Sequence, residues 1–153
     1  MRYYRVYEAL MGRHPLGFGP KGGRWNDTNV PLIYCSSTRS LALFEIYCIM
    51  GRQAAKGNFV LAELNLDGDI PTLEKNDLPV DWIRRPHSRA TKEFGTNWAK
   101  MRPSLYIKVP SARMPLSSFP EEHNLLINPF HMDFLKSVED VGIETINFEI
   151  NNR

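Results

Sequence analysis

The amino-acid sequence predicts an α+β fold, built as a single compact domain whose short strands form a split or mixed sheet. The chain has 153 residues, of which 42% are hydrophobic and 24% charged, as in an average soluble domain with one core. About six short segments have strand-like patterns and two or three have helical ones. Because strands and helices do not alternate regularly, a doubly wound parallel sheet is disfavoured. No repeat or low-complexity segment divides the chain, so we expect residues 1–153 to form one domain.

The first quarter of the chain alternates between strand-like and loop-like segments. Residues 3–8 (YYRVYE) are aromatic and β-branched, which predicts a first strand. Residues 12–23 contain five glycines and two prolines, which predicts a loop. Residues 31–35 (PLIYC) predict a short buried strand.

A helix is expected next, running to about residue 50. The hydroxyls of Ser36, Ser37 and Thr38 can cap its start, and Gly51 is placed to end it. Beyond it, residues 67–90 look irregular because they contain three prolines. Four further strands are expected, at residues 58–66, 104–109, 123–128 and 143–150. Two short helices are expected at residues 91–101, where Gly95 weakens the pattern, and at residues 131–138.

Charge and cysteine content narrow the class of protein. The net charge of +2 does not by itself indicate nucleic acid or a membrane surface as a partner. No run approaches the roughly 18 apolar residues of a membrane helix, and the N-terminus does not resemble a signal peptide. Two cysteines without a CxxC motif, and four histidines without metal-ligand spacing, predict no disulfide framework and no metal site. We therefore expect a cytoplasmic protein with reduced cysteines.

The carboxylate of Glu45 does not fit the expected core. In the segment LALFEIYCIM (residues 41–50) it is the only charged residue, and on a helix its neighbours three and four positions away are all apolar. Arg39 and Arg52 lie six and seven positions away, too far for a local helical pair. Burying an unpaired carboxylate is costly, so a partner distant in sequence must meet it. The glutamate is either half of a buried ion pair, or an exposed residue, or a functional carboxylate in a cleft of low dielectric constant.

Two further segments carry candidate functional residues. In the loop GPKGGRWN (residues 19–26), the glycines allow close approach of the backbone to a ligand, and Arg24 can bind phosphate or carboxylate through two hydrogen bonds. The loop matches neither the Walker A nor the GxGxxG motif, so taken alone it favours a flexible glycine-rich surface loop with a solvated arginine. Arg24 is also a candidate partner for Glu45. Ser111 ends a strand without a GxSxG motif, which disfavours a serine nucleophile.

Taken in order, these segments resemble the RES domain family, which is named for an Arg, a Glu and a Ser. The resemblance covers most of residues 3–136 and is carried by the segments YYRVY, GGRWN, PLIYCSSTRSLALFE, LPVDWIR, FGTNW, VPSA and NLLINPFHMDF. Residue by residue, the family's arginine, tyrosine, glutamate and serine correspond to Arg24, Tyr34, Glu45 and Ser111. The resemblance implies a fold similar to ADP-ribosyltransferases.

The same resemblance implies an enzyme and a partner. RES domains are toxins of bacterial toxin–antitoxin pairs that degrade NAD, by hydrolysis or phosphorolysis, or transfer its ADP-ribose. NAD would be a substrate, and no cofactor is implied. The expected partner is an antitoxin with an Xre-like helix-turn-helix domain that blocks the cleft, and the toxin could pair with a second copy inside that complex. No membrane and no direct nucleic-acid contact are expected.

On this basis each candidate residue receives a role. Glu45 would stabilise positive charge on the ribose, Arg24 would bind the pyrophosphate with help from the backbone at Gly23, and Tyr34 would stack on nicotinamide or ribose. Ser111 would donate a hydrogen bond to the nicotinamide half of NAD. Four further residues are secondary candidates, as pocket walls or as residues after the 123–128 strand: Trp25, Asn26, Asn128 and His131.

Three alternatives remain open from the sequence. ADP-ribose could be transferred to a protein target, because that reaction shares the same transition state. A nucleic-acid-binding module is the second alternative, supported by the pair Arg24–Trp25 and by Trp82 near two arginines. A purely structural interaction protein is the third, and it would leave Glu45 unexplained.

Overall fold

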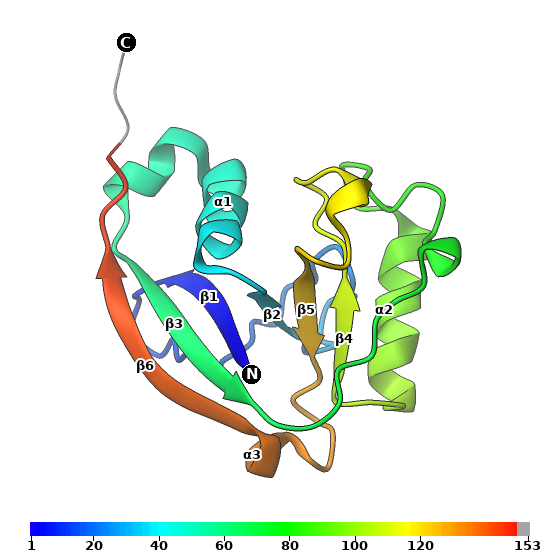
Figure 1. The fold of residues 1–153 in the computed structure, drawn as a ribbon. Coiled ribbons are helices and arrows are strands. Elements are labelled where there is room, and N and C mark those ends of the chain that lie inside the picture. Colours follow the sequence, from blue (N-terminus) through cyan, green and yellow to red (C-terminus); the bar gives the residue numbers. More distant parts are fainter. Residues whose placement is uncertain (150–153) are drawn as a thin grey trace.

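Six strands form one sheet in the order β4-β5-β2-β1-β3-β6, as Figure 1 shows for a computed structural model that describes residues 1–149. All pairings between these strands are antiparallel. The strands are β1 (Arg2–Glu8), β2 (Ile33–Ser36), β3 (Phe59–Leu66), β4 (Tyr106–Val109), β5 (Asn124–Ile127) and β6 (Val138–Ile146). The predicted α+β class is thus confirmed.

The sheet is nearly divided between β1 and β2. These two strands share a single registered pair, Tyr4 with Ser36, whereas β1 pairs with β3 along its whole length. One half of the sheet therefore consists of β1, β3 and β6, and the other of β2, β4 and β5 (Figure 1). Of the two sheet forms expected from the sequence, the split one describes this arrangement.

Each half of the sheet is covered by one long helix (Figure 1). Helix α1 (Arg39–Met50) packs Ala42 against residues of β1 and β3, including Val6 and Leu61. Helix α2 (Arg89–Met101) packs Trp98 and Ala99 against β4 and β5. The remaining helical segments are short: α3 (Phe134–Ser137) and the 3-10 turns η1 (Gly51–Lys56), η2 (Lys75–Asp77) and η3 (Leu116–Ser118).

The three hydroxyl residues expected to cap α1 have three different roles. Thr38 is the N-cap, and its hydroxyl oxygen accepts a hydrogen bond from the Leu41 backbone N–H. The Ser37 hydroxyl oxygen accepts one from the backbone of His123, and Ser36 belongs to β2. Gly51 ends the helix with φ of 53°, a conformation that favours glycine. The helix was therefore predicted with the correct bounds.

Helix α2 contains a glycine because the loop before β2 passes directly against it. A Cβ atom at Gly95 would lie 1.8 Å from the backbone oxygen of Trp25. The Asp27 N–H also donates a hydrogen bond to the hydroxyl of Thr96 on α2, at 2.9 Å. The residue that weakened the helical pattern is thus the one that lets α2 hold the 22–27 loop in place.

The last strand was predicted with the wrong bounds. We expected residues 143–150, but β6 begins at Val138 and ends at Ile146, while residue 150 lies outside the described residues. Most of β6 is exposed at the edge of the sheet, so its sequence VEDVGIETI lacks the apolar alternation of a half-buried strand. The helix expected at residues 131–138 is reduced to the single turn of α3.

Candidate active site

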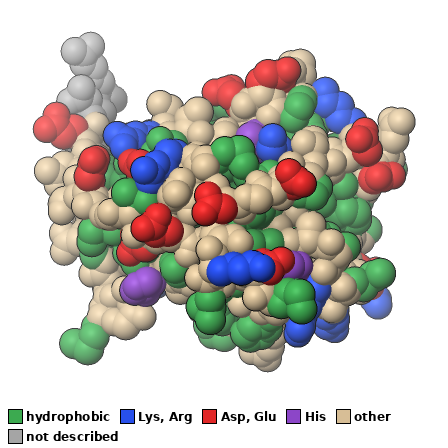
Figure 2. All heavy atoms as spheres, turned by 60° about the horizontal axis from the view of Figure 1, so that its bottom comes forward, with side chains coloured by type: hydrophobic (Ala, Val, Ile, Leu, Met, Phe, Trp, Pro, Cys, Tyr) green, Lys and Arg blue, Asp and Glu red, His purple; other side chains and the backbone are tan. Residues whose placement is uncertain are grey.

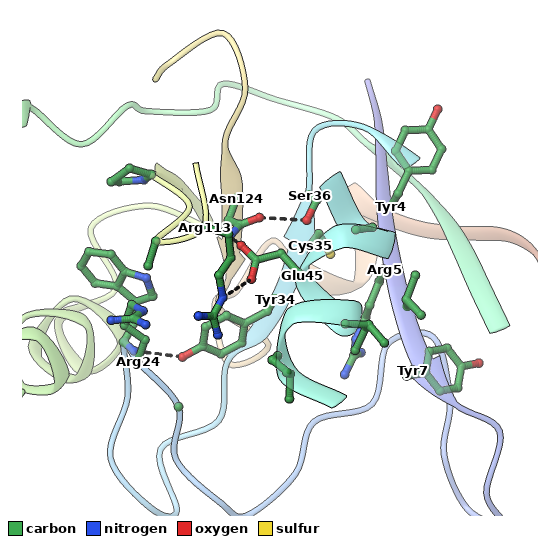
Figure 3. A pocket seen from close by; sticks show the side chains of 18 of the residues that line it. Tyr4, Arg5, Tyr7, Arg24, Tyr34, Cys35, Ser36, Glu45, Arg113 and Asn124 are labelled. Carbon is green, nitrogen blue, oxygen red and sulfur yellow. Dashed lines mark hydrogen bonds and ion pairs between the residues drawn. The ribbon is translucent and has the colours of Figure 1, made fainter. Parts of the chain in front are cut away.

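The principal pocket lies where β1 and β2 diverge, and its volume is about 340 Å³. Such a volume is at the lower end of the range for small-molecule sites. Its walls come from β1, the 23–25 loop, β2, α1 and β5, and from two loops that contribute Arg85 and His87, and Pro110, Ala112 and Arg113. Figure 3 shows side chains that line it. The split in the sheet therefore creates the site.

Glu45 is held in this pocket by two hydrogen bonds to one of its oxygens. The Ser111 hydroxyl and the Asn124 side-chain amide both donate to Oε1, each at 2.6 Å. The second oxygen, Oε2, lies 3.8 Å from Nε of Arg113. The carboxylate side chain is 21% exposed, so it is neither in bulk solvent nor sealed in the core. Its distant partner is thus Arg113, not the Arg24 that the sequence suggested.

The hydrogen-bond network around Glu45 extends to β2. The Ser36 hydroxyl donates to Oδ1 of Asn124, at 2.8 Å, which leaves the amide nitrogen of Asn124 to face the carboxylate (Figure 3). On the other side, the Ser111 hydroxyl oxygen accepts from the Arg113 backbone N–H, at 3.0 Å. These contacts fix the orientation of Glu45 from two different strand ends.

Arg24 lines the same pocket but is anchored differently. Its Nη1 donates to the backbone oxygen of Trp82 at 2.5 Å and to that of Arg84 at 3.3 Å. Burial and the charge of Arg113 lower the pKa of Arg24, while Glu45 raises it. An arginine stays protonated after such a shift, so Arg24 and Arg113 both bring positive charge to the cavity that contains Glu45. Arg5 and Arg85 line the same cavity.

The expected substrate-binding residues around Arg24 divide into pocket walls and supports. Gly23, Trp25 and Tyr34 line the pocket, whereas Asn26 does not. The Tyr34 hydroxyl donates to Oδ1 of Asn26 at 2.5 Å and accepts from the Trp25 N–H at 3.1 Å, and burial raises the pKa of Tyr34. Asn26 also bonds the N–H of Gly23 and the carbonyl of Val30. Its role is to hold the 23–26 loop in shape.

Asn128 and His131 lie outside the pocket. Asn128 is 1% exposed; its amide donates to Ala99 O, and its Oδ1 accepts from the Phe130 N–H. Nδ1 of His131 accepts from the backbone of Asp133. Both residues stabilise the turn after β5, so the structure does not bring them together with Glu45.

Several pocket residues were absent from the predicted site, and three of them bear on its chemistry. Arg113 and Asn124 contact Glu45, and His87 lines the pocket, with a pKa lowered by burial and by the charges of Arg24 and Lys92. A signal did exist for Arg113, because it stands two residues after Ser111. Nothing in the sequence indicates that Asn124 lies near Glu45. The two residues come together because β5 pairs with β2 in the sheet, in a register that places Asn124 opposite Ser36.

Neither a metal site nor a membrane-spanning helix is found in the described part of the chain. Within residues 1–149, no three side chains of His, Cys, Asp or Glu are grouped so that they could bind a metal ion. None of the helices there has the length and apolar character needed to cross a bilayer.

Comparison with known proteins identifies the family. The model of the RES domain family matches residues 2–150. The chain belongs to the RES domain family. The match extends past residue 136, where the resemblance noted in the sequence ended. The part of the chain that matches the family therefore includes α3 and β6, and β6 is the edge strand of the half of the sheet that α1 covers.

Three curated relatives and one solved structure support this assignment. A Prs ADP-ribosylating toxin from Sphingobium sp. is 34% identical over 84% of this chain and 79% of its own length. Proteins named Toxin Res from Photorhabdus laumondii and Yersinia enterocolitica are 31% and 33% identical, covering 90% and 92% of this chain and 85% and 91% of their own lengths. A chain in the crystal structure of the M. tuberculosis MbcT-MbcA toxin–antitoxin complex has the same fold, with a TM-score of 0.71 at 15% identity. That match covers 95% of this chain and 84% of the other.

Proposed function

We propose that this RES domain is the toxin of a type II toxin–antitoxin pair and that it cleaves the bond between nicotinamide and ribose in NAD. The observation that carries the proposal is the setting of Glu45. Its Oε1 is fixed by Ser111 and Asn124, and its Oε2 lies in a pocket that also presents Arg24 and Arg113. A carboxylate beside two cationic groups matches a substrate that carries phosphate at one end and develops positive charge at the other.

The reaction requires stabilisation of a sugar cation. As the C–N bond breaks, its electron pair leaves with nicotinamide, whose ring nitrogen becomes neutral, and positive charge grows on the ribose. A preorganised carboxylate in a cavity of low dielectric constant stabilises that charge more strongly than water does. Water or phosphate would then form the new bond to the same ribose carbon. Glu45 would face the ribose, with Oε2 as the oxygen available to it.

Arg24 would bind the pyrophosphate. Its anchoring to the carbonyls of Trp82 and Arg84 holds one end of the guanidinium, so less conformational freedom is lost when an anion binds the other end. Gly23 lies beside Tyr34 so closely that a Cβ atom there would be 2.8 Å from the tyrosine hydroxyl, which accounts for glycine at this position. Tyr34 would present its ring to the nicotinamide half, because its hydroxyl is already engaged by Asn26 and Trp25.

Ser111 receives a different role from the one suggested by the family resemblance. Its hydroxyl proton is directed at Glu45, and its oxygen accepts from the Arg113 backbone. We therefore assign Ser111 to positioning the carboxylate, together with Asn124, instead of to binding nicotinamide directly.

The comparisons support a restraining partner. The structural neighbour was solved as a toxin–antitoxin complex, and all three relatives are named as toxins. An antitoxin with an Xre-like helix-turn-helix domain, covering the pocket that contains Arg24 and Glu45, would prevent consumption of NAD in the host cell.

A second candidate function is transfer of ADP-ribose to a protein. The relative from Sphingobium, named as an ADP-ribosylating toxin, favours it. Both functions use the same broken bond and differ only in the group that attacks the ribose.

The nucleic-acid alternative loses its main support. Trp25 and Trp82 are only 2% and 8% exposed and stack on each other in the core, so neither offers a platform for bases. On the face shown in Figure 2, basic side chains are interspersed with acidic ones and form no continuous basic patch.

The proposal is tested by incubating the purified protein with NAD, with and without phosphate, and identifying the products by mass spectrometry. We expect free nicotinamide with no added protein acceptor, and the partner product, ADP-ribose or its phosphorylated form, identifies the attacking group. Release of nicotinamide only when a protein acceptor is present would favour ADP-ribosyl transfer. Intact NAD under all conditions would contradict both functions.

A further inference from the structure

The two oxygens of Glu45 are in unequal environments. Oε1 accepts two short hydrogen bonds, from Ser111 and Asn124. Oε2 accepts none from residues 1–149 and meets only Nε of Arg113, at 3.8 Å, a distance of ionic attraction without a hydrogen bond. The oxygen left for a substrate is therefore the one that Arg113 faces.

Arg24 and Arg113, two of the four arginines that line the pocket, are also in unequal environments. Arg24 donates to two backbone carbonyls, whereas within the described residues the guanidinium of Arg113 donates no hydrogen bond. Its side chain is 18% exposed, and its nitrogens are not among the buried atoms without a partner, so its donors keep some contact with solvent. A guanidinium that lines a pocket and has no protein acceptor within hydrogen-bond distance can bind an anion through charge-assisted hydrogen bonds.

The charges of the two arginines act on each other. Arg113 is among the groups that lower the pKa of Arg24, so the two cations repel each other across the pocket. An anion between them would remove that repulsion and would compete with Glu45 for Arg113. Both residues line the cavity that contains Glu45, so one ligand can reach all three.

We propose that Arg113 is a second anion-binding residue, and that its guanidinium leaves Glu45 for the diphosphate of the substrate when the substrate binds. Binding of the diphosphate would thereby uncover Oε2 for the ribose. The carboxylate is masked in the free protein and becomes available only with a substrate that carries the anion. This inference rests on the proposed function and adds to it a residue outside the Arg, Tyr, Glu and Ser of the family.

This exchange of partners by Arg113, from Glu45 to the diphosphate, can be tested by measuring binding alone, without turnover. ADP-ribose supplies the diphosphate without nicotinamide, and its affinity is measured by calorimetry. Arg113→Gln should weaken binding about tenfold, the effect of losing one charge-assisted contact. Glu45→Gln should strengthen it several-fold, because Arg113 no longer has to leave a carboxylate. That gain should vanish when both substitutions are combined.

Arg89→Gln is the matched control for these measurements. It removes another guanidinium that pairs with a carboxylate, Glu93, but on the outer surface of α2 with 91% of the arginine side chain exposed. It should leave ADP-ribose binding unchanged. Unaltered affinity in Arg113→Gln, or a gain from Glu45→Gln that persists in the double variant, would overturn the exchange.

Turnover supplies a second test through substrates that differ only in the anion. Arg113→Gln should lower kcat/KM for NAD about tenfold, because one anion contact is lost. It should leave cleavage of nicotinamide riboside, which has no phosphate, undiminished or raised, since Glu45 is then unmasked. An equal loss of kcat/KM with both substrates would show that Arg113 only supports the structure of the site, and it would contradict the proposal. If the unaltered protein cleaves neither substrate, the proposed function fails, while the ADP-ribose measurements still decide the role of Arg113.

Discussion

The two long helices use their side chains in opposite ways. Helix α1, RSLALFEIYCIM, has the more apolar sequence, yet only Leu41 and Ala42 on it are buried. Helix α2, RATKEFGTNWAKM, is more polar but buries five residues, among them Gly95 and Trp98. Apolar content alone therefore does not predict which helix forms the core.

The difference follows from what each helix covers. Ile46 of α1 packs against the core cluster and also lines the pocket, and Ile49 lines the pocket as well. Phe44 and Tyr47 remain exposed, at 41% and 43%. Helix α2 fills the groove over β4 and β5 and contacts the loop that carries Arg24. We conclude that α2 is the scaffold and that α1 presents the Glu45 carboxylate to the pocket.

The scaffold role of α2 is tested most severely at Gly95. Gly95→Ala should destabilise the protein by about 3 kcal/mol, because the new Cβ would overlap the backbone of Trp25 and force the loop or the helix to shift. Urea unfolding measures the change. The control is Asn97→Ala at an exposed position of the same helix, which should be neutral or slightly stabilising. In an unconstrained helix the glycine substitution would instead gain about 1 kcal/mol, so a gain would contradict this packing.

The presentation of Glu45 by α1 is tested at Asn124. Asn124→Ala removes one of the two hydrogen bonds to Oε1 and should lower kcat for NAD about 10- to 100-fold with little change in KM, since only the reactive group loses its orientation. Asn128→Ala, at the other end of β5, is the matched control. It should lower stability but leave the turnover of the folded protein unchanged. Equal kinetic effects of the two substitutions would show that Asn124 acts only through stability.

The weak packing of α1 predicts a small effect at Phe44. Phe44→Ala should cost less than about 1 kcal/mol of unfolding free energy, because the ring is already partly in water. Leu41→Ala, on the buried side of the same helix, should cost about 2 kcal/mol or more. Thermal unfolding of the two variants compares the faces directly. A loss at Phe44 as large as that at Leu41 would mean that α1 is a core helix after all.

The smallest expected effect is a dependence of stability on pH at the start of α1. His123, whose backbone N–H donates to Ser37, is in contact with the Tyr3 hydroxyl and the Pro120 carbonyl, and burial lowers its pKa. The neutral ring therefore contributes stability above the unfolded pKa of about 6.5, and this contribution is lost as pH falls through the lower folded value. His123→Gln should flatten the decline of the urea midpoint between pH 7.5 and 5.5. The exposed His14→Gln should not, and an unchanged slope in His123→Gln would remove His123 as the cause.

Features of the fold that depend on neighbouring residues, such as helix bounds, could be predicted from the sequence. The position of the edge strand β6 could not. The bounds of α1 followed from Thr38 and Gly51 because capping is a local interaction. The start of β6 could not be found in the same way, since an exposed edge strand has no apolar alternation. Gly95 was interpreted as a weak point of its helix. The backbone of Trp25, which requires a glycine at this position, lies 70 positions earlier in the chain, so local sequence gives no sign of it.

The candidate site was proposed from a residue that does not fit the sequence around it. Glu45 was identified because a charge in an apolar helical segment requires a distant partner, and the structure supplies one. That partner, Arg113, could not be chosen from the sequence, because it reaches Glu45 only through the strand order β4-β5-β2 and the loop after β4. Arg24 was an equally good choice on charge alone. In the structure, Nη1 of Arg24 donates instead to the backbone carbonyls of Trp82 and Arg84.

The central claim, that Glu45 stabilises the ribose cation, is tested most directly by comparing NAD binding with nicotinamide release in Glu45→Gln. The amide keeps the size and hydrogen-bonding reach of the carboxylate but removes its charge. We predict NAD affinity at least equal to that of the unaltered protein, and nicotinamide release slowed about 100- to 1,000-fold, the usual effect of removing one preorganised electrostatic group. Glu93→Gln on α2 should change neither. Nicotinamide release at an undiminished rate from folded Glu45→Gln protein would contradict the account.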